Sequence, residues 1–333
     1  MSFELRTDWL ETVREEILEP ERVIVDPHHH FFIETEFFPH YRLEDLWADT
    51  ETHGVAKTVY LQCGECYRKS GPEALRPVGE TEWVARIAAE AAASPDRAQI
   101  AAIVATADLT LGARVREVLE AHLEASPLFR GIRQVAVWDG SGEVQTAEGL
   151  TGPNLYGEPA FREGFQVLAD LGLSYDAYHY HHQNSYLADL ARAFPSVPIV
   201  LDHLGTPLGV GPYAGQREAV FEEWRKQLAD LAGCPNVSVK LGGLAMPWNG
   251  FGFETAARPP SSDDLVSQQA RYYHYAIETF GPDRCMFESN FPVDKLSLSY
   301  PVLWNAFKKM AAGYSESEKD ALFSGTASRV YRL

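Results

Sequence analysis

The sequence predicts a single (β/α)8 TIM barrel formed by residues 1–333. Eight short segments rich in apolar and β-branched residues recur along the chain, and helical segments separate most of them. The length of 333 residues, with 45% hydrophobic residues, fits one such barrel with long loops. A doubly wound sheet is the alternative, but the first strand runs into DPHHHFF rather than into a glycine-rich dinucleotide turn.

The expected strands are apolar runs bounded by polar or turn residues. They cover residues 23–26, 57–63, 99–105, 129–137, 173–180, 198–202, 237–241 and 284–289. Apolar residues at helical spacing predict helices over 81–93, 113–124, 158–171, 186–194, 216–232 and 265–280. Ser315 and Glu318 form a capping-box pattern, which predicts the start of a final helix. This alternation of strand and helix is the pattern of a barrel.

The remaining residues are expected to form an N-terminal helical extension (1–20) and four long loops. The loops lie near 31–50, 138–158, 204–216 and 245–262. In a barrel, the loops that follow strands shape the active site, because the carboxyl ends of all strands meet at one face.

The charge balance disfavours several classes of partner. The net charge is −18, whereas a nucleic-acid binder carries a basic face and anionic membranes repel an acidic protein. No run of 18 apolar residues predicts a membrane span, and the acidic first 20 residues are unlike a signal peptide. Four cysteines, among them the single pair Cys63 and Cys66, are too few for a disulfide scaffold. We therefore expect a cytoplasmic protein with reduced thiols that acts on a small molecule.

Histidines gather at the carboxyl ends of the expected strands. Seven of the eleven lie there: His28, His29 and His30 after the first strand, His179, His181 and His182 after the fifth, and His203 after the sixth. Since these strand ends converge in a barrel, the distribution predicts a histidine-rich site.

His28 and His30 are the strongest candidates for metal ligands. Residues i and i+2 of an extended segment point the same way, so their two imidazoles can reach one ion while His29 points elsewhere. Asp26 is a candidate to orient one of these imidazoles. The alternative is a surface loop without a ligand role, and the position at the end of an apolar strand argues against it.

The later histidines extend this site. His179 and His181 share a face, and His181 lies nearer the expected mouth, so we select it as the site residue. His179 either joins the site or packs in the core. His203 emerges where an apolar strand ends, and the alternative for it is a buried neutral histidine bonded to backbone.

The eighth strand ends in ESNFPVD. Glu288 and Asn290 share a face, and only Glu288 of the two can act as a base or an anionic ligand. Asp294 follows in a proline-containing loop, where it either faces the site or caps a helix. Glu288 and Asp294 are both candidates for the catalytic acid or base.

Inward cations are the expected means of binding an acidic substrate to an acidic protein. Arg130 and Arg133 lie on the fourth strand and Lys240 on the seventh, with outer-face salt bridges as the alternative. The loop after the second strand contributes Tyr67 as a pocket candidate, together with Glu65, Arg68 and Glu80. Loop aromatics either wall the ligand or serve loop packing or a subunit interface: Phe31, Phe32, Phe37, Phe38, Trp138, Trp248, Phe251 and Phe253.

Five motifs in their order resemble the amidohydrolase superfamily, in particular its amidohydrolase-2 branch of TIM-barrel metal-dependent hydrolases. They are VDPHHHFF, YHHQ, VLDHLGTPLG, VKLGGLAMP and ESNFPVDK, and the resemblance runs from about residue 22 to the C-terminus. The HxH of the family corresponds to His28 and His30, and its later histidines to His181 and His203. The family's strand 8 usually carries an Asp, the usual general base and often a metal ligand, where this chain has Asn290.

The resemblance implies a hydrolase that opens a small lactone or related cyclic ester, as do sugar lactonases and lactonases of pyrone dicarboxylate or muconolactone. In a metal-dependent version, His28, His30 and His203 hold a divalent ion, zinc in first place or manganese, and Glu288 or Asp294 takes the proton from water. Some lactonases of the branch work without a metal, and histidines and cations then stabilise the oxyanion. The alternatives are a metal-dependent non-oxidative decarboxylase of an aromatic acid, and a catalytically silent barrel that binds a small acid. Asn290 favours the silent barrel, and a homo-oligomer is compatible with all three interpretations.

Overall fold

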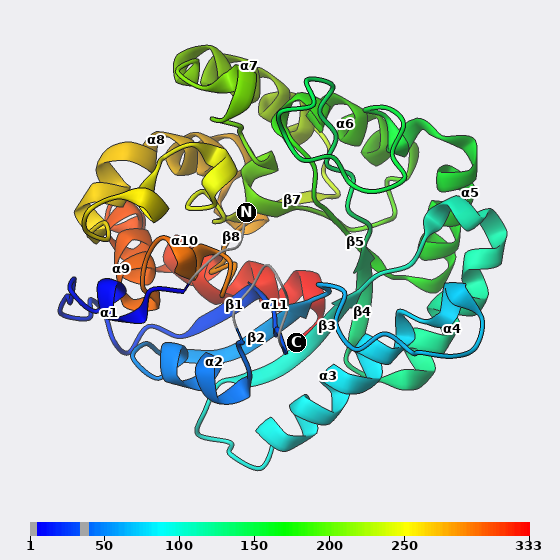
Figure 1. The fold of residues 1–333 in the computed structure, drawn as a ribbon, viewed down its shortest axis with the longest axis horizontal. Coiled ribbons are helices and arrows are strands. Elements are labelled where there is room, and N and C mark those ends of the chain that lie inside the picture. The colour runs from blue at the N-terminus through cyan, green and yellow to red at the C-terminus, as the bar shows by residue number, and fades with distance from the viewer. Residues whose placement is uncertain (1–4, 34–39) are drawn as a thin grey trace.

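The computed structural model describes residues 5–33 and 40–333, and its centre is one sheet of eight parallel strands in sequence order. A bridge between His29 and Phe291 brings the last strand back to the first. Helices surround this nearly closed ring (Figure 1), so the predicted (β/α)8 barrel is confirmed. The strands are β1 (Ile24–His29), β2 (Val55–Leu61), β3 (Gln99–Ala105), β4 (Phe129–Arg133), β5 (Ser174–Ala177), β6 (Ile199–Leu201), β7 (Val237–Leu241) and β8 (Cys285–Phe287).

The helices follow the strands in the expected alternation. They are α1 (Thr7–Leu10), α2 (Leu43–Thr50), α3 (Val78–Ala91), α4 (Val115–Ala125), α5 (Pro159–Leu171), α6 (Asn184–Ala193), α7 (Arg217–Ala232), α8 (Ser262–Phe280), α9 (Tyr300–Ala311), α10 (Glu316–Asp320) and α11 (Thr326–Tyr331). The Ser315–Glu318 capping box is present at the start of α10, as predicted. No helix in the described ranges is long and apolar enough to cross a bilayer.

Five strands end earlier than the sequence predicts, namely β2, β4, β5, β6 and β8, and β4 and β5 do so by the most. β4 ends at Arg133 and β5 at Ala177, and the Gln183 side chain binds the backbone that follows them. Its amide donates to Ala136 O at 2.7 Å and its carbonyl accepts from Trp138 N at 3.0 Å. These bonds replace sheet hydrogen bonds and lead the chain out of the barrel into its loops.

The N-terminal extension is helical only over Thr7–Leu10, and residues 1–4 lie outside the described residues. The chain after this helix is held by side chains of α9 instead of by its own helical bonds. The Asn305 amide donates to Glu16 O at 2.9 Å, and Lys308 Nζ donates to Leu18 O at 2.6 Å and to Glu19 O at 3.0 Å. Tertiary contacts thus override the local helical pattern.

Apolar side chains form two layers. A large outer layer packs the sheet against the surrounding helices. A smaller inner layer fills the barrel with Val25, Val59, Leu61, Ala102, Val104, Val200 and Met286, and α11 closes it with Ala327 and Tyr331. In Figure 1, α11 (red) accordingly lies across the central strands. The inner layer is the floor on which the polar residues of the site rest.

Candidate active site at the carboxyl ends of the strands

A buried polar cluster lies above the apolar floor of the barrel. It is formed by side chains that six strands bring together: His28 and His30 from β1 and the residue after it, Arg133 from β4, Asp176 from β5, Asp202 and His203 after β6, Lys240 from β7, and Glu288 after β8. Each is at most 5% exposed. Groups of this kind are buried only when they are paired, so their partners define the site.

Glu288 joins two of the predicted histidines. Its Oε2 lies 2.7 Å from His28 Nδ1, and its Oε1 lies 2.7 Å from His203 Nδ1 and accepts the His203 backbone N–H at 3.1 Å. A carboxylate only accepts hydrogen bonds, so His203 Nδ1 carries the ring proton and His203 Nε2 is a lone pair. His28 differs, because its Nδ1 also faces the donor Lys240 Nζ at 3.3 Å and its Nε2 faces the donor Arg133 Nη1 at 3.3 Å.

His30 presents a lone pair as well. Its Nδ1 lies 2.8 Å from the Leu61 carbonyl oxygen, which requires the ring proton on Nδ1. Its Nε2 lone pair then faces His28 Nε2 at 3.2 Å, and Arg133 Nη1 lies 3.3 Å from the same His28 nitrogen. The two ring nitrogens therefore converge on one small buried space.

The donor set fits a divalent metal ion. Tetrahedral zinc with Zn–N bonds of about 2.0–2.1 Å separates two ligand nitrogens by about 3.3 Å, close to the 3.2 Å between the two Nε2 atoms. His28, Asp202 and His203 also offer donor atoms within 4.8 Å of one another. Burial, and then the charge of Lys240, holds the pKa of His28 well below its usual range, so the imidazole is neutral as a ligand must be. For His30 the causes are burial and then the charge of Arg133.

A layer of paired charges lies against these histidines. Lys240 Nζ contacts Asp176 Oδ2 at 2.7 Å, Asp202 Oδ1 at 3.0 Å and His28 Nδ1 at 3.3 Å. Burial lowers the pKa of Lys240, but Asp176 and Asp202 outweigh burial and leave its pKa raised. The ammonium is therefore charged and fully buried, below the site rather than open to it.

Arg133 lies on the opposite side of His28. Its Nη1 is 3.3 Å from His28 Nε2 and 3.5 Å from Asp202 Oδ2, and its Nη2 donates to the Gln62 carbonyl at 2.5 Å. Its buried Nε–H has no partner. This guanidinium supplies positive charge beside His28 Nε2 when no metal is bound.

Asp294 has one hydrogen-bonded and one unpartnered carboxylate oxygen. The amide Nδ2 of Asn290 donates to Asp294 Oδ1 at 3.0 Å, while the buried Asp294 Oδ2 has no partner. Burial raises the pKa of Asp294 to about 7, although the nearby charge of His203 and the Asn290 bond lower it. Asn290 reaches this position from a left-handed backbone (φ 55°), which Asn tolerates better than most residues.

A glycine pair after β7 makes room for the cluster. A Cβ on Gly242 would lie 2.4 Å from Glu288 Cγ, and a Cβ on Gly243 would lie 2.3 Å from His203 Nδ1. His203 itself has a left-handed backbone (φ 53°), as does Leu204 (φ 56°). Strained backbone of this type concentrates at functional sites, where surrounding contacts hold it.

Of the two candidate histidines after β5, one packs in the core and the other keeps an unpartnered nitrogen. His179 is packed, with Nδ1 2.9 Å from the Tyr156 hydroxyl and Nε2 2.9 Å from Asn184 Oδ1. His181 accepts the Leu208 N–H at Nδ1 (3.4 Å), so its proton is on the buried Nε2, which has no partner. Burial lowers the pKa of His181 to about 3, so this ring is neutral and can donate a hydrogen bond.

Several other candidates lie away from the polar cluster. Asp26 accepts backbone N–H groups of His28 (3.3 Å) and Ser289 (2.9 Å), so the expectation that it orients an imidazole is wrong. Its side chain faces the outer layer, where Tyr300 also binds it. His29 points outward as predicted, against Phe31 and Tyr60.

Arg130 binds the carbonyl oxygens of Tyr331 and Pro127 at the opposite end of the barrel from the site. Tyr67 is half-buried beside Glu80, and burial and the Glu80 charge raise its pKa. Glu80 Oε1 accepts N–H groups of Cys63, Gly64 and Glu65 and thereby fixes the loop after β2. The four cysteines are free.

The loop aromatics have several roles. Phe32 and Trp248 pack with Cys63, Met246 and Val293, which come from the loops after β1, β2, β7 and β8. Phe31 and Phe253 belong to the outer core, and Phe251 packs against it beneath Arg217. Phe37 and Phe38 lie outside the described residues.

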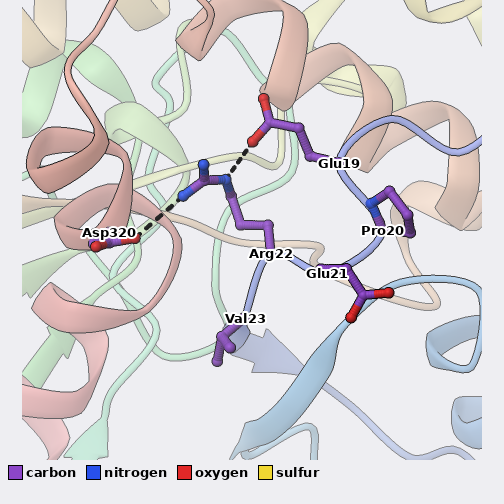
Figure 2. Close-up of a pocket in the computed structure, with 6 residues that line it drawn as sticks. All are labelled: Glu19, Pro20, Glu21, Arg22, Val23 and Asp320. Atoms are coloured by element: carbon purple, nitrogen blue, oxygen red, sulfur yellow. Dashed lines mark hydrogen bonds and ion pairs between the residues drawn. The ribbon is translucent and has the colours of Figure 1, made fainter.

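A surface hollow of about 400 Å³ lies elsewhere, at the start of β1, lined by Glu19, Pro20, Glu21, Arg22, Val23 and Asp320 (Figure 2). The Arg22 guanidinium there is already bound by Glu19, Asp320 and Glu316. Residues before a barrel strand lie at the end opposite the active face. This hollow therefore plays no part in the site, and the polar cluster carries the chemistry.

Comparison with known proteins agrees with this geometry. The family model described as Amidohydrolase matches residues 25–333. The chain belongs to the amidohydrolase family. It is 36% identical over 332 residues to the uncharacterized protein y4mH of Sinorhizobium fredii, covering 93% of this chain and 98% of that protein.

Two further relatives of this amidohydrolase come from Burkholderia multivorans. An L-fucono-1,5-lactonase is 33% identical over 138 residues, or 40% of this chain and 43% of that protein. A crystal structure of an amidohydrolase with bound zinc has a TM-score of 0.72 at 22% identity, covering 94% of this chain and all of that chain. The similarity to this crystal structure shows that the two proteins share a fold.

Four residues of this amidohydrolase site were not predicted from the sequence: Asp176, Asp202, Gly243 and Tyr331. The two acids interrupt apolar strands in SYDAY and PIVLDH, and a charge inside a buried strand must be paired. That rule, applied together with Lys240, could have identified them. Gly243 and Tyr331 are distinguished only by their spatial neighbours.

Proposed function

We propose that this amidohydrolase is a lactonase that hydrolyses an uncharged, hydroxyl-bearing lactone. The observation that carries the proposal is the set of polar atoms that the buried cluster presents at one place. The His30 Nε2 lone pair faces His28 Nε2 at 3.2 Å, and Asp294 Oδ2 is an unpartnered acceptor. Together they offer a place for an electrophile and a base for water, which are the two requirements of ester hydrolysis.

Asp294 is the general base in this proposal. Glu288 Oε1 is bonded to His203, and Glu288 Oε2 lies 2.7 Å from His28 Nδ1, so a proton on either oxygen would disturb one of these contacts. Asp294 has one oxygen fixed by Asn290 and one free, and its pKa of about 7 matches a base that works near neutral pH. Asn290, which occupies the place of the usual family aspartate, thus positions the base.

His28, His30 and His203, with Asp202, are the residues that would hold a zinc or manganese ion. When bound, such an ion polarises the lactone carbonyl and lowers the pKa of water. Glu288 keeps His203 Nε2 as a lone pair for this purpose, and the Leu61 carbonyl does the same for His30 Nε2. In a metal-free enzyme, Arg133 and His181 would take over stabilisation of the oxyanion.

The chain's own groups account for each proton. Asp294 Oδ2 removes a proton from water, and the oxygen of that water bonds to the lactone carbonyl carbon. The buried N–H groups of Arg133 (Nε) and His181 (Nε2), both unpartnered, donate to the substrate's oxygens. The bond from the carbonyl carbon to the ring oxygen then breaks, and Asp294 returns its proton to that oxygen. The product is an open hydroxy acid.

The charges of the cluster indicate an uncharged substrate rather than the acidic one expected from the sequence. Around the site, the two cations Lys240 and Arg133 face the three carboxylates Asp176, Asp202 and Glu288. Both cations are already paired, so no surplus positive charge is left for a substrate carboxylate. An L-fucono-1,5-lactonase among the relatives is compatible with an uncharged lactone.

A two-substrate assay tests this proposal. The purified enzyme is offered L-fucono-1,5-lactone and 2-pyrone-4,6-dicarboxylate at neutral pH, and the open acid is measured by mass spectrometry after subtraction of spontaneous hydrolysis. We expect turnover of the uncharged lactone and at least about tenfold lower kcat/KM for the dicarboxylate. The Asp294→Asn variant is the control for enzyme-dependent turnover. Preference for the dicarboxylate, or release of carbon dioxide from an aromatic acid without any lactone opening, would refute the proposal.

A further inference from the structure

The last helix of the chain reaches the active site from below. Tyr331, in the final turn of α11, is fully buried among the apolar side chains that fill the barrel. Its hydroxyl donates to Asp176 Oδ2 at 2.6 Å. A residue two positions from the C-terminus thus contacts the polar cluster through the floor of the barrel.

Asp176 connects Tyr331 to the centre of the site through Lys240. The same oxygen, Oδ2, accepts Lys240 Nζ at 2.7 Å, and Lys240 in turn contacts Asp202 Oδ1 at 3.0 Å. Lys240 also lies 5.5 Å from the centre of the Tyr331 ring, over its face. Tyr331 therefore holds the lysine by a shared carboxylate and by its aromatic ring.

The geometry indicates why the hydroxyl is needed. Asp176 Oδ1 is buried without a partner, so the position of this carboxylate depends on the two donors at Oδ2. If one of them is lost, the carboxylate can rotate about its side chain. Lys240 would then follow it and move away from Asp202, which is one of the residues that would hold the metal ion.

We propose that Tyr331 is a positioning residue for the reaction, acting through Asp176 to hold Lys240 against Asp202. The expected effect on turnover rests on the proposed lactonase function. The competing interpretation is that Tyr331 only closes the barrel, so that its hydroxyl contributes to stability and not to turnover.

Tyr331→Phe and Tyr175→Phe form a matched pair that separates these interpretations. Tyr175 is also fully buried and donates its hydroxyl at 3.0 Å to the Gln134 carbonyl. It precedes Asp176 on β5 but belongs to the outer layer, away from the cluster. Both variants lose one buried tyrosine hydroxyl, and only one of them touches the Asp176–Lys240 pair.

With the lactone that the wild-type enzyme hydrolyses, we expect Tyr331→Phe to lower kcat by about tenfold, the effect of losing a charge-assisted hydrogen bond. KM should stay within about twofold, because the ground-state contacts of the substrate are intact. Tyr175→Phe should change neither constant. In the Asp176→Asn background the effect of Tyr331→Phe on kcat should largely vanish, since the residue acts through Asp176. Equal kinetics of the two tyrosine variants, or an undiminished effect in the Asp176→Asn background, would overturn the proposal.

A second readout does not depend on turnover. In protein labelled with 15N at lysine Nζ, the resonance of the buried Lys240 ammonium reports its position directly, and Lys240→Met assigns it. We expect Tyr331→Phe to shift this resonance and Tyr175→Phe to leave it in place. If the wild-type chain opens no lactone, the proposed function fails, and a shifted resonance still supports the positioning role. An unshifted resonance contradicts it.

Discussion

The substitution Gly243→Ala tests the packing of the site most directly. Gly243 has a left-handed backbone (φ +69°), and an added Cβ would lie 2.3 Å from His203 Nδ1 and 2.5 Å from its Cγ. Ordinary contacts between such atoms are about 3.5 Å or more, so the imidazole must move by about 1 Å. The bond between His203 Nδ1 and Glu288 Oε1, at 2.7 Å, cannot survive that shift.

The expected loss of stability in Gly243→Ala has two parts. The left-handed backbone makes alanine about 1–2 kcal/mol less favourable than glycine. Loss of the charge-assisted bond to Glu288 adds about 1.5–3 kcal/mol to the destabilisation. A displacement of about 1 Å in a catalytic group lowers turnover by roughly 10²-fold.

Gly172→Ala is the matched control for Gly243→Ala. Gly172 ends α5 with a similar backbone (φ +65°), and nothing lies within 4 Å of an added Cβ. Lactone kcat/KM, metal content and urea unfolding are measured for both variants. Both should lose the backbone part of the stability, and only Gly243→Ala should lose turnover. If the two variants keep the same kcat/KM, His203 is not held as the structure indicates, and the reasoning fails.

The remaining predictions concern the base, the metal and the carboxylate between the histidines. Asp294→Asn should lower kcat by about 10²–10⁴-fold, because the variant has no base. The kcat/KM of the wild type should fall as the pH drops below about 7, where Asp294 becomes protonated. A kcat/KM that does not change with pH would contradict the role of Asp294 as the base. Mass spectrometry of the tag-free protein should find about one zinc or manganese per chain, lost in the His28→Ala/His30→Ala variant; a folded, active and metal-free wild type would support the metal-free mechanism instead. Glu288→Gln should lower the unfolding free energy by about 2–4 kcal/mol in a urea titration, because the charge-assisted bond to His203 and the charged contact with His28 are lost; unchanged stability would show that Glu288 does not hold the two imidazoles.

The sequence was most informative where local pattern and barrel topology agree. Strand order and strand-end histidines follow from the pattern alone, so the spacing of His28, His30 and His203 suffices to place them at one face of the barrel. The pattern failed where side chains from distant segments replace regular structure, as Gln183 does after β4. It also missed α2, which lies within the loop expected near 31–50, and α9, which is buried on nearly all sides.

The choice between Glu288 and Asp294 shows a second kind of limit. Both are acids near the end of the same strand, and the sequence left both as candidates with Glu288 ahead. They differ only in what other segments offer them: two imidazoles for Glu288 and one amide for Asp294. Which carboxylate keeps a free oxygen is decided by long-range contacts that sequence spacing does not contain.

The ionised Asp294 carboxylate lowers the stability of the fold, although the proposed reaction needs it as a base. Asp294 has a pKa of about 7 in the folded chain against 3.8 as its ordinary value. The folded state therefore binds this proton more tightly, so its contribution to stability is complete below about pH 4 and is lost as the pH rises through 7. Above pH 7 the ionised, buried carboxylate costs up to about 4 kcal/mol. Asp294→Asn removes that cost and keeps the bond from Asn290, so this variant should be more stable than wild type at pH 8 while it is nearly inactive. An aspartate kept for structure alone would show the opposite sign in stability, so the two measurements together distinguish a catalytic base from a structural aspartate.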